Sequence, residues 1–251
     1  MCSFGAAIFK REKAASCPMR FYILPVIDLS WHERLFRTAK VELFNSRRIQ
    51  TMDHEYIENY FQQVKTIVDS INEDKIEKII DILLSVRESG KRLFFIGVGG
   101  SAGSASHAVN DFRKICGFEA YAPTDNVSEL TARVNDDGWE SVFSSWLKVS
   151  RIRKGDAVFV FSVGGGSEGK KISVNIVEAL KLAREVGAYI LGVVGRDGGY
   201  TAQVADACIV IPTLAPDTVT PLVESFHGVI WHLLVSHPRL KKNDAKWESM
   251  K

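Results

Sequence analysis

Four side chains that can transfer protons or bind a metal ion occur at helical spacing in two parts of the chain. His107 and Asp111 are four residues apart, so they are neighbours on a helix. Glu224 and His232 occur eight residues apart near the end of the sequence. Carboxylates and imidazoles serve as general acids and bases, and they are also common ligands of Zn²⁺. The pattern indicates an acid–base or metal site, although an isolated His–Asp pair also fits an ordinary polar helix face.

Two turns rich in glycine and serine suggest where a phosphate would bind. Residues 97–101 read Gly-Val-Gly-Gly-Ser, and residues 162–167 read Ser-Val-Gly-Gly-Gly-Ser. Glycines let the backbone approach a ligand, and a helix that follows presents free N–H groups and the positive end of its dipole. Lys170 and Lys171 are expected in the first turn of a helix, where an anionic ligand would offset their unfavourable position. The alternative is that both lysines are solvated and compensated by Glu168. The candidate residues of this site are Gly99, Gly100, Ser101, Ser162, Gly164, Gly165, Gly166, Ser167 and Lys170.

A nucleotide cofactor is not expected. Residues 97–102 partly match the dinucleotide fingerprint, but that fingerprint requires an acid at the tip of the second strand, about 20 residues further on. Here Asp125 follows only after Pro123, and the P-loop pattern is absent. Two separate turns fit a sugar phosphate better than a pyrophosphate on one helix.

The elements that must position these groups alternate between apolar strands and amphipathic helices. Two helices come first, near 54–71 and 73–89. Strands are then predicted over 93–96, 118–122, 157–161, 189–194 and 207–211, with helices near 101–115, 138–149, 171–186 and 221–235. This alternation predicts a doubly wound α/β fold with a five-stranded parallel sheet. In such sheets ligands bind beyond the carboxyl ends of the strands, which is where the glycine turns lie.

The last helix has an unusual polar face. Its predicted apolar arc consists of Leu222, Val223, Phe226, Val229, Ile230 and Leu233. Glu224, His227, Trp231 and His232 fall outside that arc, and a tryptophan with two histidines makes an improbable solvent face. We therefore expect a pocket or a second subunit to cover it, and we predict that another subunit buries Trp231.

Composition limits the class of protein. The chain has 251 residues, of which 46% are hydrophobic and 25% charged, as in soluble globular domains. The net charge of +2 gives no basic excess that would indicate nucleic acid. The apolar run over 21–27 is too short to span a bilayer, which needs about 20 residues. The four cysteines form no CxxC pair, so a cytoplasmic location is expected.

Three regions are predicted along the chain. Residues 1–50 carry a local excess of positive charge and are expected to form a loosely packed extension. Residues 51–238 contain the helices, the sheet and the motifs, and residues 239–251 form a polar tail.

Taken together, the motifs resemble the phosphoheptose isomerases, which belong to the sugar isomerase (SIS) domain proteins. The resemblance covers about residues 54–238 and rests on the turns at 97–101, 162–167 and 195–199, on His107–Asp111, on Asn135–Asp136 and on the last helix. It implies an aldose–ketose isomerase that interconverts sedoheptulose 7-phosphate and a manno-heptose 7-phosphate through an enediol. It also implies a homotetramer with active sites between subunits, and zinc in some members.

The resemblance also implies roles for individual residues. His107 is expected to be a metal ligand or another histidine of the site, Asp111 takes the place of a catalytic glutamate, and His232 takes the place of the catalytic histidine. Glu224 stands where the family has a glutamine, and Asp125 or Asn126 matches a substrate-contacting aspartate. The predicted catalytic residues are therefore Asp111, Glu224 and His232, and the predicted metal ligands are His107, Asp111, Glu224 and His232.

Geometry constrains that ligand set. Eight residues along one helix span about 12 Å at 1.5 Å per residue, so Glu224 and His232 are expected to meet only when they come from different chains. The alternative is a metal-free site in which these groups act separately as acids, bases and hydrogen-bonding groups.

Some positions depart from the family pattern. Val98 replaces an asparagine, and Val163 and Gly164 replace hydroxyl residues. The loss of these groups favours a competing hypothesis, in which a non-catalytic SIS module senses a sugar phosphate or holds an assembly together. The cluster of histidines and acids argues against it, because a sensor does not need acid–base groups.

Overall fold

The computed structural model describes residues 53–244. The predicted extension over 1–50 lies outside the described residues, as does the tail beyond 244. A helix over 53–70 comes first. The elements that follow are α2 (Glu73–Glu88), β1 (Leu93–Ile96), α3 (Gly100–Lys114), β2 (Ala120–Tyr121), the 3-10 turn η1 (Pro123–Asp125), α4 (Val127–Asp137), α5 (Val142–Val149), β3 (Ala157–Ser162), α6 (Val174–Val186), β4 (Tyr189–Val194), α7 (Gly199–Val204), β5 (Ala207–Val210) and α8 (Val219–Ser236). None of the helices within 53–244 has both the length and the apolar character needed to cross a membrane.

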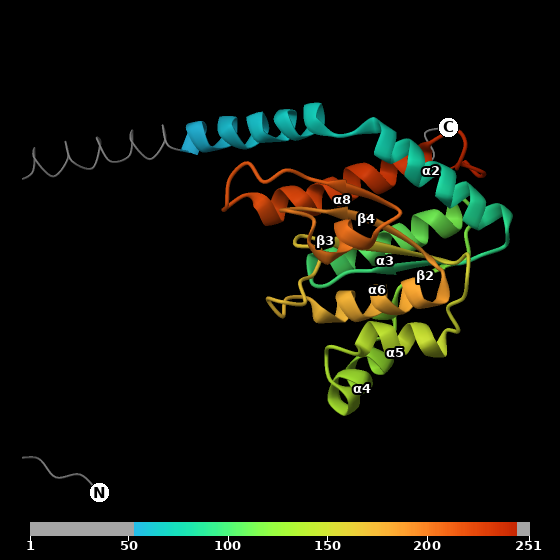
Figure 1. Ribbon diagram of the computed structural model, residues 1–251. Coiled ribbons are helices and arrows are strands. Elements are labelled where there is room, and N and C mark those ends of the chain that lie inside the picture. The colour runs from blue at the N-terminus through green and yellow to red at the C-terminus, as the bar shows by residue number, and fades with distance from the viewer. Residues whose placement is uncertain (1–52, 245–251) are drawn as a thin grey trace, which may run out of the picture. The chain divides into compact units, whose positions relative to one another are not determined.

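The five strands form one parallel sheet in the order β2-β1-β3-β4-β5 (Figure 1). The predicted doubly wound parallel sheet is confirmed. After β1 the chain forms β2, at one edge of the sheet, and it then crosses back so that β3 lies on the other side of β1. Ligands in open α/β sheets bind at this switch point, beyond the carboxyl ends of the strands.

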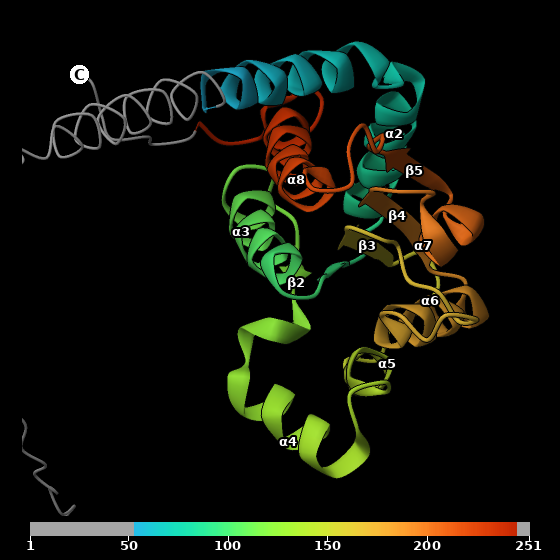
Figure 2. The same ribbon diagram turned by 90° about the vertical axis from the view of Figure 1, so that its left-hand side faces the viewer.

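Helices cover both faces of the sheet, and the strand residues are buried on both sides. Phe94 and Phe95 are adjacent in β1 and fully buried, yet they belong to different apolar clusters because successive strand residues point to opposite faces. Phe95 packs with α2, α3 and α8, whereas Phe94 packs with α5 and α6. Figure 2 shows α3 and α8 side by side on the first of these faces.

Several predicted boundaries were wrong. The region expected to hold a polar loop and one helix near 138–149 contains two helices, α4 and α5, and β2 is shorter than the predicted 118–122. Helix α4 has no apolar stripe to detect because it buries no residue; Val127, for example, is 66% exposed. A short helix, α7, follows β4 where only a turn was expected.

The segment before α6 also differs from the prediction. The helix begins at Val174 rather than near 171, because Ser167 and Ile172 first form an antiparallel bridge. Lys170 and Lys171 therefore lie in a turn ahead of the helix, and their predicted conflict with its dipole was wrong. Glu168 pairs with Lys181 at 2.8 Å instead of compensating the two lysines.

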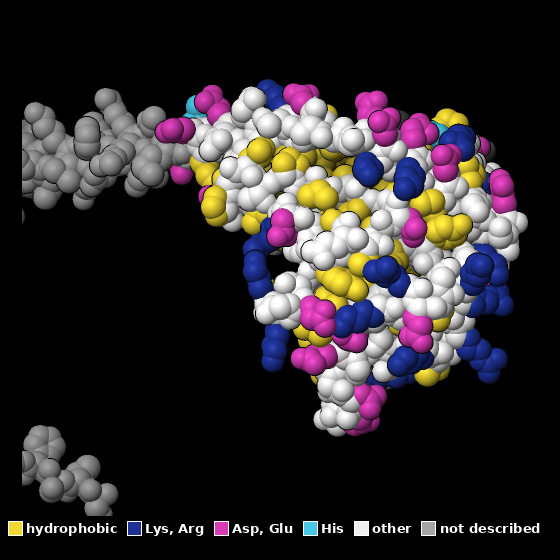
Figure 3. Space-filling view, in the orientation of Figure 1, with side chains coloured by type: hydrophobic (Ala, Val, Ile, Leu, Met, Phe, Trp, Pro, Cys, Tyr) yellow, Lys and Arg dark blue, Asp and Glu magenta, His cyan; other side chains and the backbone are white. Residues whose placement is uncertain are grey.

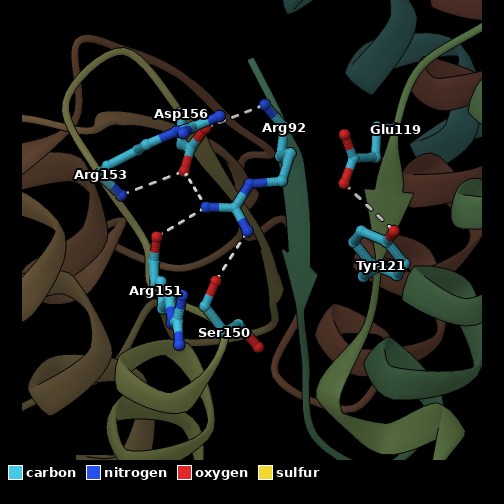
Figure 4. A network of polar contacts seen from close by, with 7 residues as sticks. All are labelled: Arg92, Glu119, Tyr121, Ser150, Arg151, Arg153 and Asp156. Atoms are coloured by element: carbon cyan, nitrogen blue, oxygen red, sulfur yellow. Dashed lines mark hydrogen bonds and ion pairs between the residues drawn. The ribbon is translucent and has the colours of Figure 1, made fainter. Parts of the chain in front are cut away.

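A buried ion pair joins the residues just before β1 and β3. It lies at the amino ends of these strands, whereas the switch point lies at their carboxyl ends. The carboxylate of Asp156 is fully buried and accepts from the Arg92 backbone N–H at 3.0 Å, the Arg92 guanidinium at 2.8 Å and the Arg153 backbone N–H at 3.1 Å (Figure 4). The guanidinium also donates to the carbonyls of Ser150 and Arg151, both at 2.7 Å. This network fixes the loop before β3 without involving the candidate site.

We predict that Asp156→Ala lowers the free energy of unfolding by about 3–5 kcal/mol, because it leaves the Arg92 guanidinium without its buried partner. Asp81→Ala is the matched control. Asp81 pairs with Arg239 at the surface, and its loss should cost less than about 1 kcal/mol. Urea unfolding measures both, and equal losses in the two variants would contradict a special role for the buried pair.

Candidate functional site

A cavity of about 590 Å³ lies at the carboxyl ends of β1, β3 and β4, next to the start of α8. It occupies the switch point of the sheet, as expected from the glycine turns. The predicted residues that line it are Ser101, Ser162, Gly164, Gly166, Ser167, Lys170 and Glu224. The structure thus brings together most of the predicted phosphate-binding residues, and it places Glu224 with them.

Two turns pack against each other to form the wall of the cavity. Gly165 has a φ of +67°, and a Cβ at this position would overlap the carbonyl oxygen of Gly198. Thr201 donates both its hydroxyl and its backbone N–H to the Gly165 carbonyl, at 2.7 and 2.9 Å. Tyr200 donates its backbone N–H to the Gly166 carbonyl at 2.8 Å. The motif at 195–199 therefore serves to hold the turn at 162–167 in place.

The hydroxyl groups of the cavity are oriented by backbone donors. The Ser162 hydroxyl oxygen accepts from the Gly165 N–H at 3.0 Å, and that of Ser167 accepts from the Lys170 N–H at 3.3 Å. Each hydroxyl proton is thereby left to donate elsewhere. An anionic ligand in the cavity is the natural acceptor for both.

The side chain of Glu224, a residue of α8, lies against the start of α3. The Ser101 hydroxyl donates to its carboxylate at 3.4 Å, and a Cβ at Gly100 would overlap that carboxylate. The amino end of a helix favours negative charge, so the Glu224 carboxylate is placed where α3 offers its positive dipole end. The missing Cβ of Gly100 allows this close approach, and Gly99 precedes the helix with a φ of +62°, which favours glycine.

Several residues that line the cavity were not predicted from the sequence, and Arg196 and Ser173 are two of them. Arg196 belongs to the noted motif at 195–199, but no role was predicted for it; it lines the cavity with a φ of +54° and adds a second cation to Lys170. Ser173 lines the cavity immediately before α6, with a φ of +48° and no side-chain capping bond. A serine directly before an apolar helical run is an N-cap signal that could have identified this position.

His107, Asp111 and His232 form a second cluster on α3 and α8. The Asp111 Oδ2 atom lies 3.5 Å from Nε2 of His107 and 3.5 Å from Nε2 of His232. One ligand atom from each residue lies within 4.8 Å of the others. Asp111 is buried, whereas both histidines are about half exposed, so the cluster opens to the surface.

This donor set fits a zinc ion. Two imidazole nitrogens and one carboxylate oxygen make three protein ligands, which leaves a fourth position open as in catalytic zinc sites. Within the described residues of one chain Glu224 is not a member of the cluster, because it faces the cavity eight residues earlier on α8. The prediction that it joins the set from a different chain stays a prediction.

The prediction that another subunit buries Trp231 was wrong. Its side chain is only 6% exposed within its own chain, because its indole donates to Asp111 at 3.1 Å and its ring packs against His107 and Phe161. The face of α8 that packs into the core is therefore rotated relative to the predicted apolar arc. Val229 and Leu233, which were expected in the core, are 49% and 40% exposed.

His227, also expected on the polar face, is fully buried and stacks on Phe161 with ring centroids 4.8 Å apart. Burial lowers the pKa of His227 to about 4, although the Val193 carbonyl partly opposes the shift. The unfolded chain binds a proton near pH 6.5, so the folded state loses stability as the pH falls from about 6.5 to about 4.

We therefore predict that His227 contributes a loss of up to about 3 kcal/mol in the free energy of unfolding across this window, and that His227→Phe removes this part. Urea unfolding of both proteins at pH 7 and pH 4.5 measures the difference. An identical pH dependence in the two proteins would contradict a buried neutral histidine.

Asp125 and Asn126 lie apart from the main cavity. They line a second hollow of about 380 Å³ together with Tyr121 and Trp146. Asn126 caps α4 by accepting from the Glu129 N–H at 3.3 Å, and Asp125 accepts from the Ser106 hydroxyl. A substrate role for either residue stays a prediction.

The fold and these two sites define a member of the SIS domain family, to which the chain belongs: residues 56–195 match that family. The chain is 33% identical over 188 residues to the phosphoheptose isomerase of Geotalea daltonii, covering 72% of this chain and 92% of that protein. It is 30% identical over 191 residues to the phosphoheptose isomerase of Aneurinibacillus thermoaerophilus, covering 72% and 91%. The solved structure of phosphoheptose isomerase from Neisseria gonorrhoeae has the same fold, with a TM-score of 0.64 at 24% identity over 75% of this chain and 97% of that one. The resemblance seen in the motifs is confirmed.

Proposed function

We propose that the chain is an aldose–ketose isomerase acting on a sugar phosphate, and that it converts sedoheptulose 7-phosphate into a manno-heptose 7-phosphate in the cytoplasm. The observation that carries the proposal is that a hydroxyl-lined cavity at the carboxyl ends of the strands and a cluster of acid–base groups on α3 and α8 occur in the same domain. The named activity of the relatives supports the choice of sugar.

The cavity supplies the binding half of the reaction. The substrate phosphate accepts from Ser162 and Ser167, and from Ser101 once its hydroxyl turns from Glu224 to the phosphate, and it pairs with Lys170 and Arg196; all five residues line one cavity. These two cations replace the donors that are missing at Val163 and Gly164. Charge-assisted bonds of this kind are stronger than neutral ones, so the loss of two hydroxyls does not rule out binding.

The acidic groups supply the chemistry. Asp111 or Glu224 removes a proton from the carbon next to the carbonyl, which leaves an enediol, and returns it to the neighbouring carbon. His232 moves the proton between the two oxygens. In the alternative with a metal ion, zinc held by His107, Asp111 and His232 would polarise those oxygens as a Lewis acid, and Glu224 would be the base.

We also propose a homo-oligomer, most simply a tetramer, with each site shared between chains. Large apolar side chains are exposed on the helix over 53–70, where Tyr56 and Phe61 are 56% and 60% exposed, and on α8 at Val229 and Leu233. Figure 3 shows hydrophobic side chains at the surface below that first helix. In such an oligomer we expect Glu224 of one chain to meet the His107–Asp111–His232 cluster of another, because Glu224 and His232 lie about 12 Å apart along one helix.

The competing function is a non-catalytic module that binds a sugar phosphate. Val163 and Gly164 line the cavity where the resemblance implies hydroxyl groups, and this observation favours it. The two functions differ in turnover. Purified full-length protein, chelated or zinc-loaded, is incubated with heptose, hexose and pentose ketose phosphates, and aldose formation is measured. Binding without aldose formation from any of them would favour the module.

We predict that Ser101→Ala weakens substrate binding by about 1–3 kcal/mol, or about 5- to 150-fold, because the phosphate loses a donor at the start of α3. Ser85→Ala, at an exposed position on α2, is the control and should leave affinity unchanged. Calorimetric titration with sedoheptulose 7-phosphate gives both values. Unchanged affinity in Ser101→Ala would show that the substrate phosphate does not bind in this cavity.

A further inference from the structure

Trp231 is the one buried residue of α8 whose polar atom reaches the acid–base cluster in the described part of the chain. Its indole N–H donates to the Asp111 Oδ2 atom at 3.1 Å, and the side chain is 6% exposed. The indole is a donor only, so a bond to a buried carboxylate both satisfies the indole and fixes the carboxylate. The immediate neighbour His232 brings its own ring to the same oxygen.

The Asp111 carboxylate is held at both ends. Asn110 donates to Oδ1 at 3.0 Å, while Trp231 donates to Oδ2. Aspartate has a short side chain, so its oxygens cannot move far from α3. A donor fixed on α8 therefore sets the rotation of the carboxylate relative to the two histidines.

The indole ring also orders both histidines. Its centroid lies 5.2 Å from that of His107 and 4.8 Å from that of His232. Behind it the ring meets Phe161, in the core, at 6.0 Å. The indole is thus packed between the rigid sheet and all three candidate metal ligands.

We propose that Trp231 is a positioning residue of the metal site: its N–H orients Asp111, and its ring orients His107 and His232, so that the three ligands are arranged before the ion binds. This inference rests on the proposed function only in that the cluster binds a divalent cation. Groups that orient metal ligands in this way typically change metal affinity by about 10- to 100-fold.

The test compares Trp231→Phe, which keeps an aromatic ring but lacks the N–H, with Trp139→Phe, a matched change at a 41% exposed position on the surface. Zinc affinity of the full chain is measured by competition with a chromophoric chelator, and the melting temperature is measured in parallel. Trp231→Phe should bind zinc about 10- to 100-fold more weakly, and Trp139→Phe should match the wild type. Equal zinc affinity in all three proteins would overturn the proposal.

A second measurement gives its decisive result on the wild-type protein. In wild-type protein the indole N–H resonance of Trp231 should be protected from exchange with solvent, and this protection should be lost in Asp111→Ala. An unprotected resonance in the wild type would overturn the proposal. A wild type that binds no zinc would also overturn it, whereas isomerase activity in that same protein would leave the proposed function standing.

Discussion

Asp111→Asn is expected to lower the turnover number of the isomerase by about 100- to 10,000-fold, the range that a general acid or base contributes. Asparagine keeps the shape of the side chain and can still accept from Trp231, but it can neither take up a proton nor offer a charged ligand. The fold should therefore persist while the chemistry fails. Turnover is measured with saturating sedoheptulose 7-phosphate.

Asp81→Asn is the control for this change, since Asp81 is an exposed acid on α2 that pairs with Arg239. It should retain wild-type turnover. An Asp111→Asn protein with turnover within about threefold of wild type would show that Asp111 takes no part in proton transfer, because a general base contributes at least about 100-fold.

Gly165→Ala is expected to damage both stability and binding. The position has a φ of +67°, and a methyl group there would overlap the Gly198 carbonyl. A strained φ and an overpacked contact together should lower the free energy of unfolding by about 2–4 kcal/mol. Because the same turn forms the cavity wall, affinity for sugar phosphate should fall by at least about tenfold, the equivalent of about 1.4 kcal/mol.

Gly103→Ala is the matched control. Gly103 lies within α3, and a methyl group there would meet no atom within 4 Å. Replacing it should raise the free energy of unfolding by about 0.4–1 kcal/mol, because alanine restricts the unfolded chain. Similar losses of the free energy of unfolding in Gly165→Ala and Gly103→Ala would contradict a stabilising contact between the turns at 162–167 and 195–199.

The strands and the cavity could be predicted because their signals are local. A parallel strand buried on both faces is a short apolar run, and β1 and β4 have the predicted bounds. The glycine turns followed those runs, so the edge that binds ligands was also predictable. By contrast, α4 buries no side chain and left no apolar stripe to detect.

The buried face of α8 could not be predicted because it depends on partners far away in the sequence. Trp231 is buried because Asp111 on α3 accepts its N–H, and His227 because Phe161 on β3 covers its ring. The apolar arc predicted from the sequence leaves out both residues and instead includes Val229 and Leu233. The packing of Gly165 against Gly198 is likewise a contact between two turns, which spacing alone does not reveal.

In the proposed function, the cluster on α3 and α8 moves a proton between adjacent carbons of a sugar phosphate. The most direct measurement is incubation of the full-length protein with sedoheptulose 7-phosphate in D₂O, followed by NMR. We expect an aldose product from the wild type, with deuterium on the carbon next to the aldehyde wherever the base exchanges its proton with solvent before returning it, and no aldose from Asp111→Asn. Substrate that binds to the wild type but gains no deuterium and yields no aldose would contradict the proposed function.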